Sequence, residues 1–434
     1  MSADGGGDGR FLAAGDCRGG GELVARARLL FLAQLLPWPL IGGGQIRSYY
    51  LLRSLAEDYD IRLLSLIRRE SERAYLSEVA PFCRLGAETV RLRRDRLRDG
   101  WTAAASVLTG RSFLVERDRA AGMTGAVRRE IAGGGYDLIW ADHLPMIGFV
   151  PEDRGRARLV LGEHNVEYRI PERYAETADA FWLRAFARAE SLRLKRFETA
   201  SVRRADWTVT VSEEDARTLR SLVPECSDRV FSVPIGIDTG YFSPLERDPN
   251  ARTLLSIGTM YWPPNVDAIH YFHERIYPKI KAEFPSVRLN IVGTGPVSSI
   301  VALGKADESV TVTGTVPDVR PYGRDCAAFI VPLRSGSGMR VKILNAMAMG
   351  LPVVSTTMGA EGIDVTPERD ILLADTPEAF ASAVLSLLRS PDRAEELGRN
   401  GRRLAEARYS WQRVGSDLRS ALRARLAGGG AAAG

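Results

Sequence analysis

The chain has 434 residues, which at ~100–200 residues per domain predicts two or three domains. Hydrophobic residues make up 45% and charged residues 26% of it, as in ordinary globular proteins, and the net charge of +5 fits a phosphate-containing ligand, an anionic surface or only a basic solvated surface. The cysteines are far apart and form no pattern typical of a disulfide framework or structural zinc, which favours a reducing cytoplasm: Cys17, Cys83, Cys226 and Cys326.

Both ends of the chain are rich in glycine. Residues 1–26 lack the basic start and apolar core of a signal peptide, so we expect a disordered leader there. Residues 427–434 are expected to form a disordered tail. No apolar run reaches the ~18 residues of a membrane-spanning helix, because the first long run, 29–41, is broken by two prolines.

Short apolar runs alternate with longer segments of helical periodicity along most of the chain. Continuous apolar strands between helices predict a parallel sheet covered on both faces, and there are too many such runs for one ordinary doubly wound sheet. We therefore predict an α/β protein with two Rossmann-like domains, 27–238 and 239–407, divided where Gly, Pro and Asp interrupt the pattern. The predicted strands are 29–36, 61–67, 137–140, 158–161, 207–211, 230–233, 253–257, 287–292, 310–313, 327–333, 352–355 and 371–373.

Three consecutive glycines, Gly42 to Gly44, lie between the first strand and a helix expected from about Gln45. Glycines at such a turn let backbone N–H groups approach an anion, and the helix N-terminus adds a favourable dipole. Arg47 in the first turn would add a charge-assisted bond to phosphate. The segment is neither a G-x-G-x-x-G nor a P-loop motif, so a flexible turn with a surface arginine is an equally open interpretation.

Two of the four histidines follow predicted strands of the first domain. His143 lies in IWADHLPM and His164 in LVLGEHNVEY, so both are expected at the edge of the sheet that faces the second domain. They are candidates for polarising a substrate or a phosphate, and a purely structural role stays open for both. His270 and His273 lie on a predicted helix and are expected at the surface.

An Arg-rich amphipathic helix is predicted over about 184–204. Such a helix can lie on an anionic membrane surface. A helix that packs on the sheet and turns its basic face to solvent shows the same pattern, and we favour this second interpretation.

The C-terminal segment LRSGSGMRVKILNAMAMGLPVVST carries the strongest candidate site. Small residues precede a helix expected from about Met339 to Met349, and Arg340 and Lys342 stand at its start. The helix dipole disfavours cations there unless an anion binds nearby, so the pair is suited to a diphosphate. Asn345, one turn further on, offers both a donor and an acceptor.

Other glycine-containing turns are expected at the same edge of the second sheet. Gly258-Thr259 ends one strand, Gly293 to Gly295 ends the next, and the turn from Gly314 through Val316 ends a third. Because ligands of open parallel sheets bind beyond the carboxyl ends of the strands, these turns predict a nucleotide crevice.

Taken in order, these segments resemble glycosyltransferase family 4, a group of retaining enzymes with two Rossmann-like domains (the GT-B fold). The resemblance runs from about residue 28 to residue 425. It rests on GGGQIR, RRADWTVTVSEEDARTL, VFSVPIGIDTGYFSP, SIGTMYWPPNVDAI, VGTGP, GTVPDVRPY, GSGMRVKILNAMAMGLPVVST and GAEGI.

The resemblance implies that a nucleotide diphosphate-sugar binds in the C-terminal domain and that a final helix, within 408–426, crosses back to the N-terminal domain. It also implies a hexosyltransferase that needs no metal and no cofactor, since basic residues and a helix terminus neutralise the leaving diphosphate. On the residues and the resemblance together, we assign Arg340, Lys342 and His143 as catalytic and His164 as a further candidate. The residues assigned to the donor are Gly43, Gly44, Arg47, Gly258, Thr259, Gly293, Gly295, Val316, Ser337, Gly338, Asn345 and Glu361.

The chain departs from the family pattern at the donor site. The family commonly has two glutamates eight residues apart, and here those positions are Ser337 and Asn345. Asn345 can still hydrogen-bond a ribose, more weakly than a carboxylate, while Ser337 leaves recognition of the sugar open. The Arg and Lys that commonly follow the first donor-domain strand are also missing, so Arg340 and Lys342 are expected to bind the diphosphate instead.

The expected function is a retaining transfer to a glycan or lipid-linked acceptor, in cell-surface polysaccharide or glycoconjugate synthesis. We expect the protein in the cytoplasm, with peripheral contact to an anionic membrane at its inner face left open. Two alternatives also stay open: a nucleotide-sugar binder weakened in catalysis, and another GT-B enzyme such as an epimerase or phosphorylase. The missing G-x-G-x-x-G disfavours a dinucleotide-dependent oxidoreductase, and nucleic-acid binding is disfavoured because the basic residues do not gather with aromatic ones.

Overall fold

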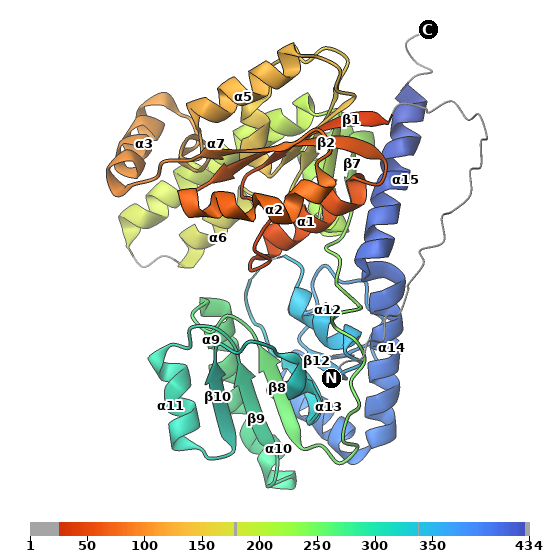
Figure 1. Ribbon diagram of the computed structural model, residues 1–434. Helices are drawn as coiled ribbons and strands as arrows, with labels where there is room; N and C mark the ends of the chain where they lie inside the picture. The colour runs from red at the N-terminus through yellow and green to blue at the C-terminus, as the bar shows by residue number, and fades with distance from the viewer. Residues whose placement is uncertain (1–25, 178–179, 337, 430–434) are drawn as a thin grey trace, which may run out of the picture.

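The computed structural model describes residues 26–177, 180–336 and 338–429. Two parallel sheets lie one above the other, and helices cover them (Figure 1). Most of the predicted leader, the last five residues of the predicted tail, Cys17 and Ser337 lie outside the described residues. The predicted α/β class with two Rossmann-like sheets is confirmed.

The first sheet has seven parallel strands in the order β3-β2-β1-β4-β5-β6-β7. Alternate residues of β1 are buried in hydrophobic clusters on its two faces, Leu30 and Leu32 on one and Leu29 and Phe31 on the other. Burial on both faces explains why these strands read as continuous apolar runs. The strands are β1 (Ala27–Ala33), β2 (Tyr59–Ile67), β3 (Ala87–Arg91), β4 (Leu138–Asp142), β5 (Arg158–Gly162), β6 (Trp207–Thr210) and β7 (Val230–Ser232).

The edge strand β3 is absent from the sequence-based prediction. Its sequence, AETVR, is short, contains two charged residues and buries only Thr89, with Val90 half-buried, so it lacks the apolar run that marks the inner strands. An edge strand needs little apolar surface, because one side of it faces solvent.

The second sheet has six parallel strands in the order β10-β9-β8-β11-β12-β13. All six were predicted to within two residues at each end. They are β8 (Thr253–Ile257), β9 (Arg288–Val292), β10 (Val310–Gly314), β11 (Cys326–Val331), β12 (Val353–Ser355) and β13 (Leu372–Leu373).

The helices of the first half surround its sheet. Asp95 caps the N-terminus of α3 by accepting the Arg98 N–H, and Gly110 ends that helix with a φ of +68°. The helices are α1 (Gly43–Leu55), α2 (Leu76–Val79), α3 (Arg96–Thr109), α4 (Phe113–Glu116), α5 (Ala121–Ala132), α6 (Arg169–Thr177), α7 (Phe181–Arg204) and α8 (Glu213–Leu222).

In the second half, the predicted helix that carries His270 and His273 is interrupted. A single π-helical turn, Phe272–Ile276, separates α9 (Pro263–Tyr271) from α10 (Tyr277–Glu283). Apolar periodicity continues across such a turn, so the pattern does not reveal it. The remaining helices are α11 (Ser298–Ala306), α12 (Val341–Ala348), α13 (Pro377–Arg389), α14 (Pro391–Tyr409) and α15 (Trp411–Gly429).

The final helix returns to the first half, as predicted. The chain passes along the second half as α14 and continues along the first half as α15, on the right in Figure 1. Trp411 stacks on Tyr50 of α1 with ring centroids 4.6 Å apart, and Arg419 donates to Ser54 Oγ over 2.7 Å. The helix continues to Gly429, into the predicted tail, because a glycine costs a helix only about 1 kcal/mol.

The described helices also bear on membrane topology. None of them combines the length and the apolar character needed to cross a bilayer. Of the cysteines within the described ranges, all three are buried and free.

Candidate active site

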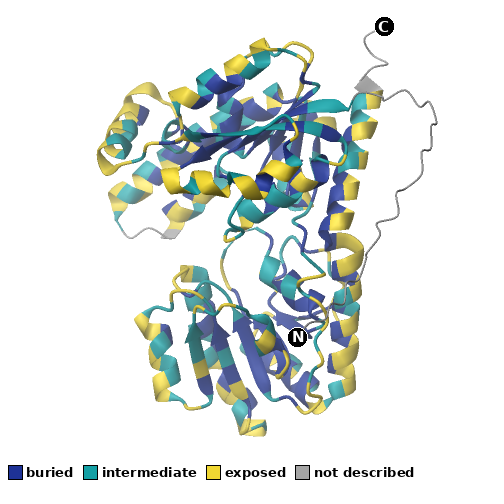
Figure 2. Cartoon of the chain, viewed as in Figure 1, coloured by how far each residue is buried: buried dark blue, intermediate teal, exposed yellow. Residues whose placement is uncertain are grey.

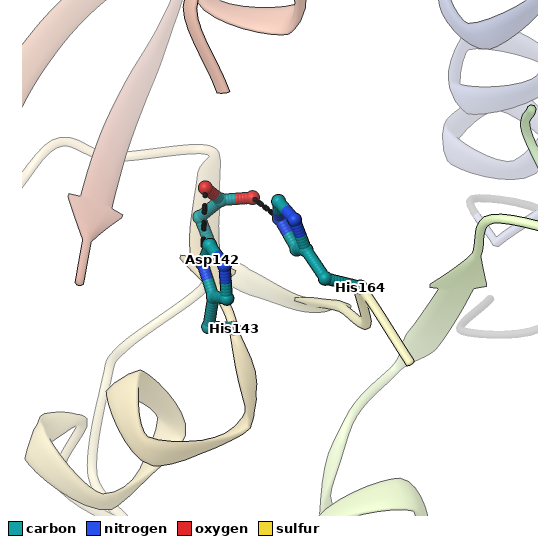
Figure 3. Close-up of side chains that lie close together, drawn as sticks. All are labelled: Asp142, His143 and His164. Carbon is teal, nitrogen blue, oxygen red and sulfur yellow. Dashed lines mark hydrogen bonds and ion pairs between the residues drawn. The ribbon is translucent and has the colours of Figure 1, made fainter. Parts of the chain in front are cut away.

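Two imidazoles and one carboxylate meet at the carboxyl ends of β4 and β5 (Figure 3). The rings of His143 and His164 stack with centroids 3.4 Å apart and planes 15° from parallel. Asp142, the last residue of β4, accepts a hydrogen bond from His164 Nε2 at 3.0 Å, and its other oxygen lies 3.5 Å from His143 Nδ1. The structure thus brings together both histidines singled out from the sequence.

The backbone at His143 supports a functional role. Its φ is +79°, a left-handed value that non-glycine residues rarely adopt. Such strain tends to persist where the surrounding structure fixes a side chain for function. The His143 side chain is 15% exposed, whereas Asp142 beside it is fully buried, so His143 is the member of the group that can meet a ligand.

The buried environment fixes the protonation of this group. Burial, with contributions from His143 and Arg47, lowers the pKa of His164 to about 3. Burial alone would raise the pKa of Asp142, but its interactions with His164 and His143 outweigh burial and hold that pKa well below its usual range. At neutral pH, His164 is therefore a neutral imidazole that donates Nε2–H to an ionised Asp142.

These three side chains are also of the kinds that bind metals, and their ligand atoms all lie within 4.8 Å of one another. Asp142, however, already accepts hydrogen bonds from Ser48 and Trp140 as well as from His164. The in-plane lone pairs of two nearly parallel imidazoles also do not converge on one point as metal ligands must. We interpret the group as a hydrogen-bonded one.

The glycine turn lies directly against the histidines. Gly42 caps α1, and Gly43 and Gly44 form its first turn, so the helix begins two residues earlier than predicted. A methyl group added at Gly44 would lie 3.1 Å from His143 Nε2 and 3.6 Å from His164 Nδ1, whereas one added at Gly43 would meet nothing within 4 Å. Gly44 is therefore needed for the approach of the imidazoles, a role that the sequence pattern did not indicate.

Arg47 is placed differently from the expectation. Its side chain is fully buried, and Nη1 donates to the backbone oxygen of Glu163 over 3.2 Å. Burial lowers its pKa to about 10, while the nearby carboxylates of Asp142 and Glu163 oppose that shift. A guanidinium enclosed in this way does not reach a ligand outside the domain, so this placement does not provide the expected contact with a diphosphate. Nor is Arg47 the surface arginine of the alternative interpretation.

The glycine turns of the second half pack against one another. Gly293 has a φ of +156°, and a methyl group there would overlap the backbone oxygen of Gly258. Gly295, with a φ of +63°, packs against the ring of Tyr261. Thr259 accepts a hydrogen bond from the side chain of Asn265 over 2.9 Å. The turns after β8 and β9 therefore form one surface at the carboxyl edge of the second sheet, as predicted.

Arg340 and Lys342 lie at the start of α12, beside these turns. Lys342 Nζ donates to Asn265 Oδ1 over 3.0 Å, and Lys342 borders a small cavity. Burial, reinforced by the charge of Arg340, lowers the pKa of Lys342 to about 8. No carboxylate among the described residues forms an ion pair with Lys342. A desolvated lysine beside an arginine at a helix start is suited to bind an anion.

The space in front of Gly258 belongs to the same site. A methyl group there would lie 3.0 Å from Lys342 Nζ, so a glycine is needed for the close approach of the ammonium to this turn. Asn345 is half-buried one turn further along α12, and Val316 packs against the core of the second half. Ser337 lies outside the described residues.

A pocket lies between the two halves of the protein and is lined by residues of both. From the first half, Arg173 of α6 donates to the backbone oxygen of Gly336 over 3.4 Å. From the second half, Glu361 and Gly338 line the pocket. Burial, together with the nearby Glu214 of the first half, raises the pKa of Glu361. Gly338 and Glu361, both assigned from the sequence, thus border a space between the domains.

Three residues of these groups were not singled out from the sequence. Asp142 directly precedes His143 at a strand end, a signal that was present in IWADH. Asn265 and Arg173 lie on α9 and α6, and only the folded chain brings them to Lys342 and Gly336.

Two family models match the chain. Residues 41–241 match the model described as Glycosyltransferase Family 4, and residues 251–390 match the model described as Glycosyl transferases group 1. Each covers one of the two sheets almost completely.

Several curated proteins are similar over long segments. The MMP alpha-(1->4)-mannosyltransferase of Mycolicibacterium hassiacum is 26% identical over 325 residues, 72% of each chain. The D-inositol 3-phosphate glycosyltransferase of Segniliparus rotundus is 26% identical over 250 residues, 52% of this chain and 54% of that protein. A 44.6 kDa protein in the cps region of Klebsiella pneumoniae is 24% identical over 173 residues, 38% of this chain and 44% of that protein. The chain spans about half the length of these last two relatives.

Solved structures share the fold over nearly the whole chain. Sucrose-phosphate synthase from Thermosynechococcus elongatus superposes with a TM-score of 0.66 at 18% identity, over 92% of this chain and 100% of that one. Anabaena HepE in complex with UDP superposes with a TM-score of 0.63 at 14% identity, over the same shares. From these family matches, and from the two facing parallel sheets with their returning helix, we conclude that the chain belongs to glycosyltransferase family 4 and has the GT-B fold.

Proposed function

We propose that the protein transfers a hexosyl group from a nucleotide diphosphate-sugar to a hydroxyl of a glycan or lipid-linked acceptor, with retention of configuration at the anomeric carbon. The observation that carries the proposal is the pair Arg340 and Lys342. Both stand at the start of α12, and Lys342 is desolvated without a carboxylate partner in the described part of the chain. Such a site stabilises a diphosphate, the leaving group of this reaction.

The donor is oriented along the carboxyl edge of the second sheet. The diphosphate contacts Arg340 and Lys342, Asn345 hydrogen-bonds the ribose, and the turn that contains Val316 flanks the base. The turns are free of side chains at Gly258, Gly293 and Gly295, so the nucleotide can lie directly over them. Anabaena HepE forms a complex with UDP, and two similar proteins are GDP-mannose-dependent mannosyltransferases, so uracil and guanine are the first bases to test here.

Transfer then requires one bond to break and one to form. The bond between the anomeric carbon and the diphosphate oxygen breaks, and the diphosphate keeps the electron pair. The acceptor oxygen bonds to the same carbon, and its proton passes to the released diphosphate. Arg340 and Lys342 stabilise the growing negative charge more in the transition state than in the ground state, which is what accelerates the step.

The first domain supplies the other wall of the site. His143 presents its exposed edge where the transferred sugar and the acceptor hydroxyl would meet. Asp142 and His164 hold His143 in place from below. Closure of the two domains would exclude water, which otherwise hydrolyses the donor.

A second candidate function is nucleotide-sugar binding with weakened catalysis. It is favoured by one observation: Ser337 and Asn345 stand where the family commonly has glutamates. A serine cannot supply the charge of a carboxylate to the sugar. This candidate predicts nucleotide binding without turnover of any donor.

A thermal-shift screen of UDP, GDP, TDP, CDP and ADP tests the donor site first. A ligand at ~100 times its Kd adds ~2.7 kcal/mol to the free energy of unfolding, which raises Tm by several degrees. One nucleotide that gives a shift, lost in Arg340→Ala, is the expected result. No shift with any of the five contradicts a functional donor site. Release of nucleoside diphosphate from matching donors then separates transfer from binding alone.

A further inference from the structure

Helix α3 is almost without tertiary packing. Of its 14 residues, only Ser106 is buried. Leu97, Trp101 and Leu108 are 80%, 77% and 88% exposed, and with Ala104 they follow the spacing i, i+4, i+7, i+11 that places them on one side of the helix. Helices in proteins are usually stabilised by burying their apolar side, and within the described chain nothing covers this one.

The start of α7 also carries large exposed apolar side chains. Phe181 and Trp182 are 76% and 60% exposed. The ring of Phe113, just after α3, packs against Phe186 with centroids 6.2 Å apart, and Arg193 of α7 donates to Ser106 over 3.3 Å. These contacts bring the end of α3 next to the middle of α7, at the edge of the first domain opposite α15 (Figures 1 and 2).

We define the α3–α7 surface by its five large apolar residues, Leu97, Trp101, Leu108, Phe181 and Trp182. Single exposed apolar side chains are normal, but five on two neighbouring helices mark an interaction site. Two tryptophans among them are typical of the boundary between headgroups and acyl chains of a bilayer.

The charges around this surface identify the partner. Arg96, Arg184 and Arg188 are exposed and form no ion pair within the described residues. Arg96 and Arg184 stand in the first turns of α3 and α7, where the helix dipole disfavours a cation. The acidic residues of α3 are already engaged, since Asp95 caps the helix and Asp99 pairs with Arg94. Uncompensated arginines beside an apolar surface complement an anionic one.

We propose that the α3–α7 surface docks the protein on an anionic lipid bilayer, with the tryptophans and leucines in the headgroup boundary and the arginines on lipid phosphates. The basic stretch of α7 beyond residue 188 is not this surface, because its inner side packs on the first domain through residues such as Leu194 and Val202. The proposal goes beyond the glycosyl transfer proposed above and does not depend on it.

Flotation of the full-length protein with vesicles tests the proposal. With vesicles of phosphatidylcholine that contain about a third phosphatidylglycerol, we expect binding at low salt that weakens as salt is raised, and little binding to phosphatidylcholine alone. The pair Leu97→Ser and Trp101→Ser should reduce the bound fraction by roughly fivefold or more. The pair Arg96→Glu and Arg184→Glu should abolish the preference for anionic vesicles.

Matched controls separate docking from folding. Arg128→Glu with Arg403→Glu makes the same change of charge at exposed arginines of α5 and α14, and it should leave binding nearly unchanged. All variants should keep the Tm of the parent and the same nucleotide-induced shift, so a failure of the donor site is recognised separately.

Three outcomes would overturn the proposal. One is no binding to anionic vesicles, and another is an equal loss in the control pair. The third is a dimer by light scattering that Trp101→Ser converts to a monomer, since the surface would then be a contact between two copies of the chain.

Discussion

His164 donates its Nε2–H to Asp142 Oδ1 over 3.0 Å, from one strand end to the next. This bond also helps to fix His143, because the ring of His164 lies flat against that of His143, the more exposed of the two. Asp142 thus acts on the exposed imidazole through a buried one and through its own second oxygen. It is a positioning residue of the kind that supports catalytic side chains from behind.

Asp142→Asn should lower kcat by roughly 10- to 100-fold, the usual effect of removing such a support, with little change in the KM for the donor. An asparagine can still accept from His164 with Oδ1, but its Nδ2–H2 then faces His143 Nδ1. His143 would have to reverse its tautomer, so that Nε2 turns from an acceptor into a donor. Steady-state kinetics of the variant check this expectation.

Two further measurements separate positioning from other roles of Asp142. The pKa of His164 is lowered to about 3, so its protonation should not cause any loss of activity between pH 5 and 8. Dialysis against EDTA should also leave activity unchanged. Activity lost with EDTA and restored by zinc would make Asp142, His143 and His164 a metal site instead. If Tm fell so far that partial unfolding accounted for the whole loss of kcat, Asp142 would be merely structural.

Gly44→Ala should impair catalysis because of a single methyl group. That group would lie 3.1 Å from His143 Nε2, so the imidazole or the helix start must shift. We expect kcat to fall by about tenfold or more, since displacements below 1 Å are costly at such sites. Gly43→Ala is the matched control on the same turn of α1, where nothing lies within 4 Å.

The two alanine variants should both fold and should differ in activity. In a helix, alanine is favoured over glycine by about 1 kcal/mol, so Gly43→Ala should raise Tm slightly and keep full activity. Equal activity of the two variants would remove Gly44 from the site.

The sequence predicted the inner strands well, since burial on both faces leaves uninterrupted apolar runs such as that of β1. It did not predict β3, whose only buried residue is Thr89, at a sheet edge. The predicted start of α1 was also displaced, because consecutive glycines are typical of a loop. Gly43 and Gly44 nevertheless form the first helical turn.

The candidate site likewise has parts that the sequence predicts and parts that it does not. Arg340 and Lys342 could be assigned from local signals, since their position at a helix start is visible in the sequence. Arg47 could not be placed, because an arginine in the first turn of a helix can face a ligand or be buried against Glu163. The pairing of Lys342 with Asn265 depends on residues 77 positions apart, which only packing brings together.

Arg340→Ala should reduce kcat/KM by ~10²–10³ if this guanidinium stabilises the leaving diphosphate. The kcat/KM of Arg340→Lys should lie between those of the parent protein and Arg340→Ala, since lysine keeps the charge but lacks the planar fork that binds phosphate oxygens in pairs. The comparison is made with the donor that the thermal-shift screen selects. A loss below threefold in Arg340→Ala would take this residue out of the catalytic machinery.

Lys342 gives the donor site its own pH dependence. Burial and the neighbouring Arg340 lower its pKa to about 8, so the free protein loses this charge as pH rises through 8. A bound diphosphate favours the charged form and raises the pKa, so binding above pH 8 must take up a proton. The affinity for nucleoside diphosphate should therefore fall by roughly tenfold per pH unit above 8, because each unit of pKa shift is worth about 1.36 kcal/mol.

Calorimetric titration between pH 7.5 and 9.5 measures this dependence, in a range where the diphosphate itself is fully ionised. Lys342→Arg should bind with nearly constant affinity over the range, because an arginine stays charged there. Lys342→Met should bind weakly and also without pH dependence. If the methionine variant showed the same decline as the parent protein, the titrating group would be another residue, and Lys342 would not contact the diphosphate.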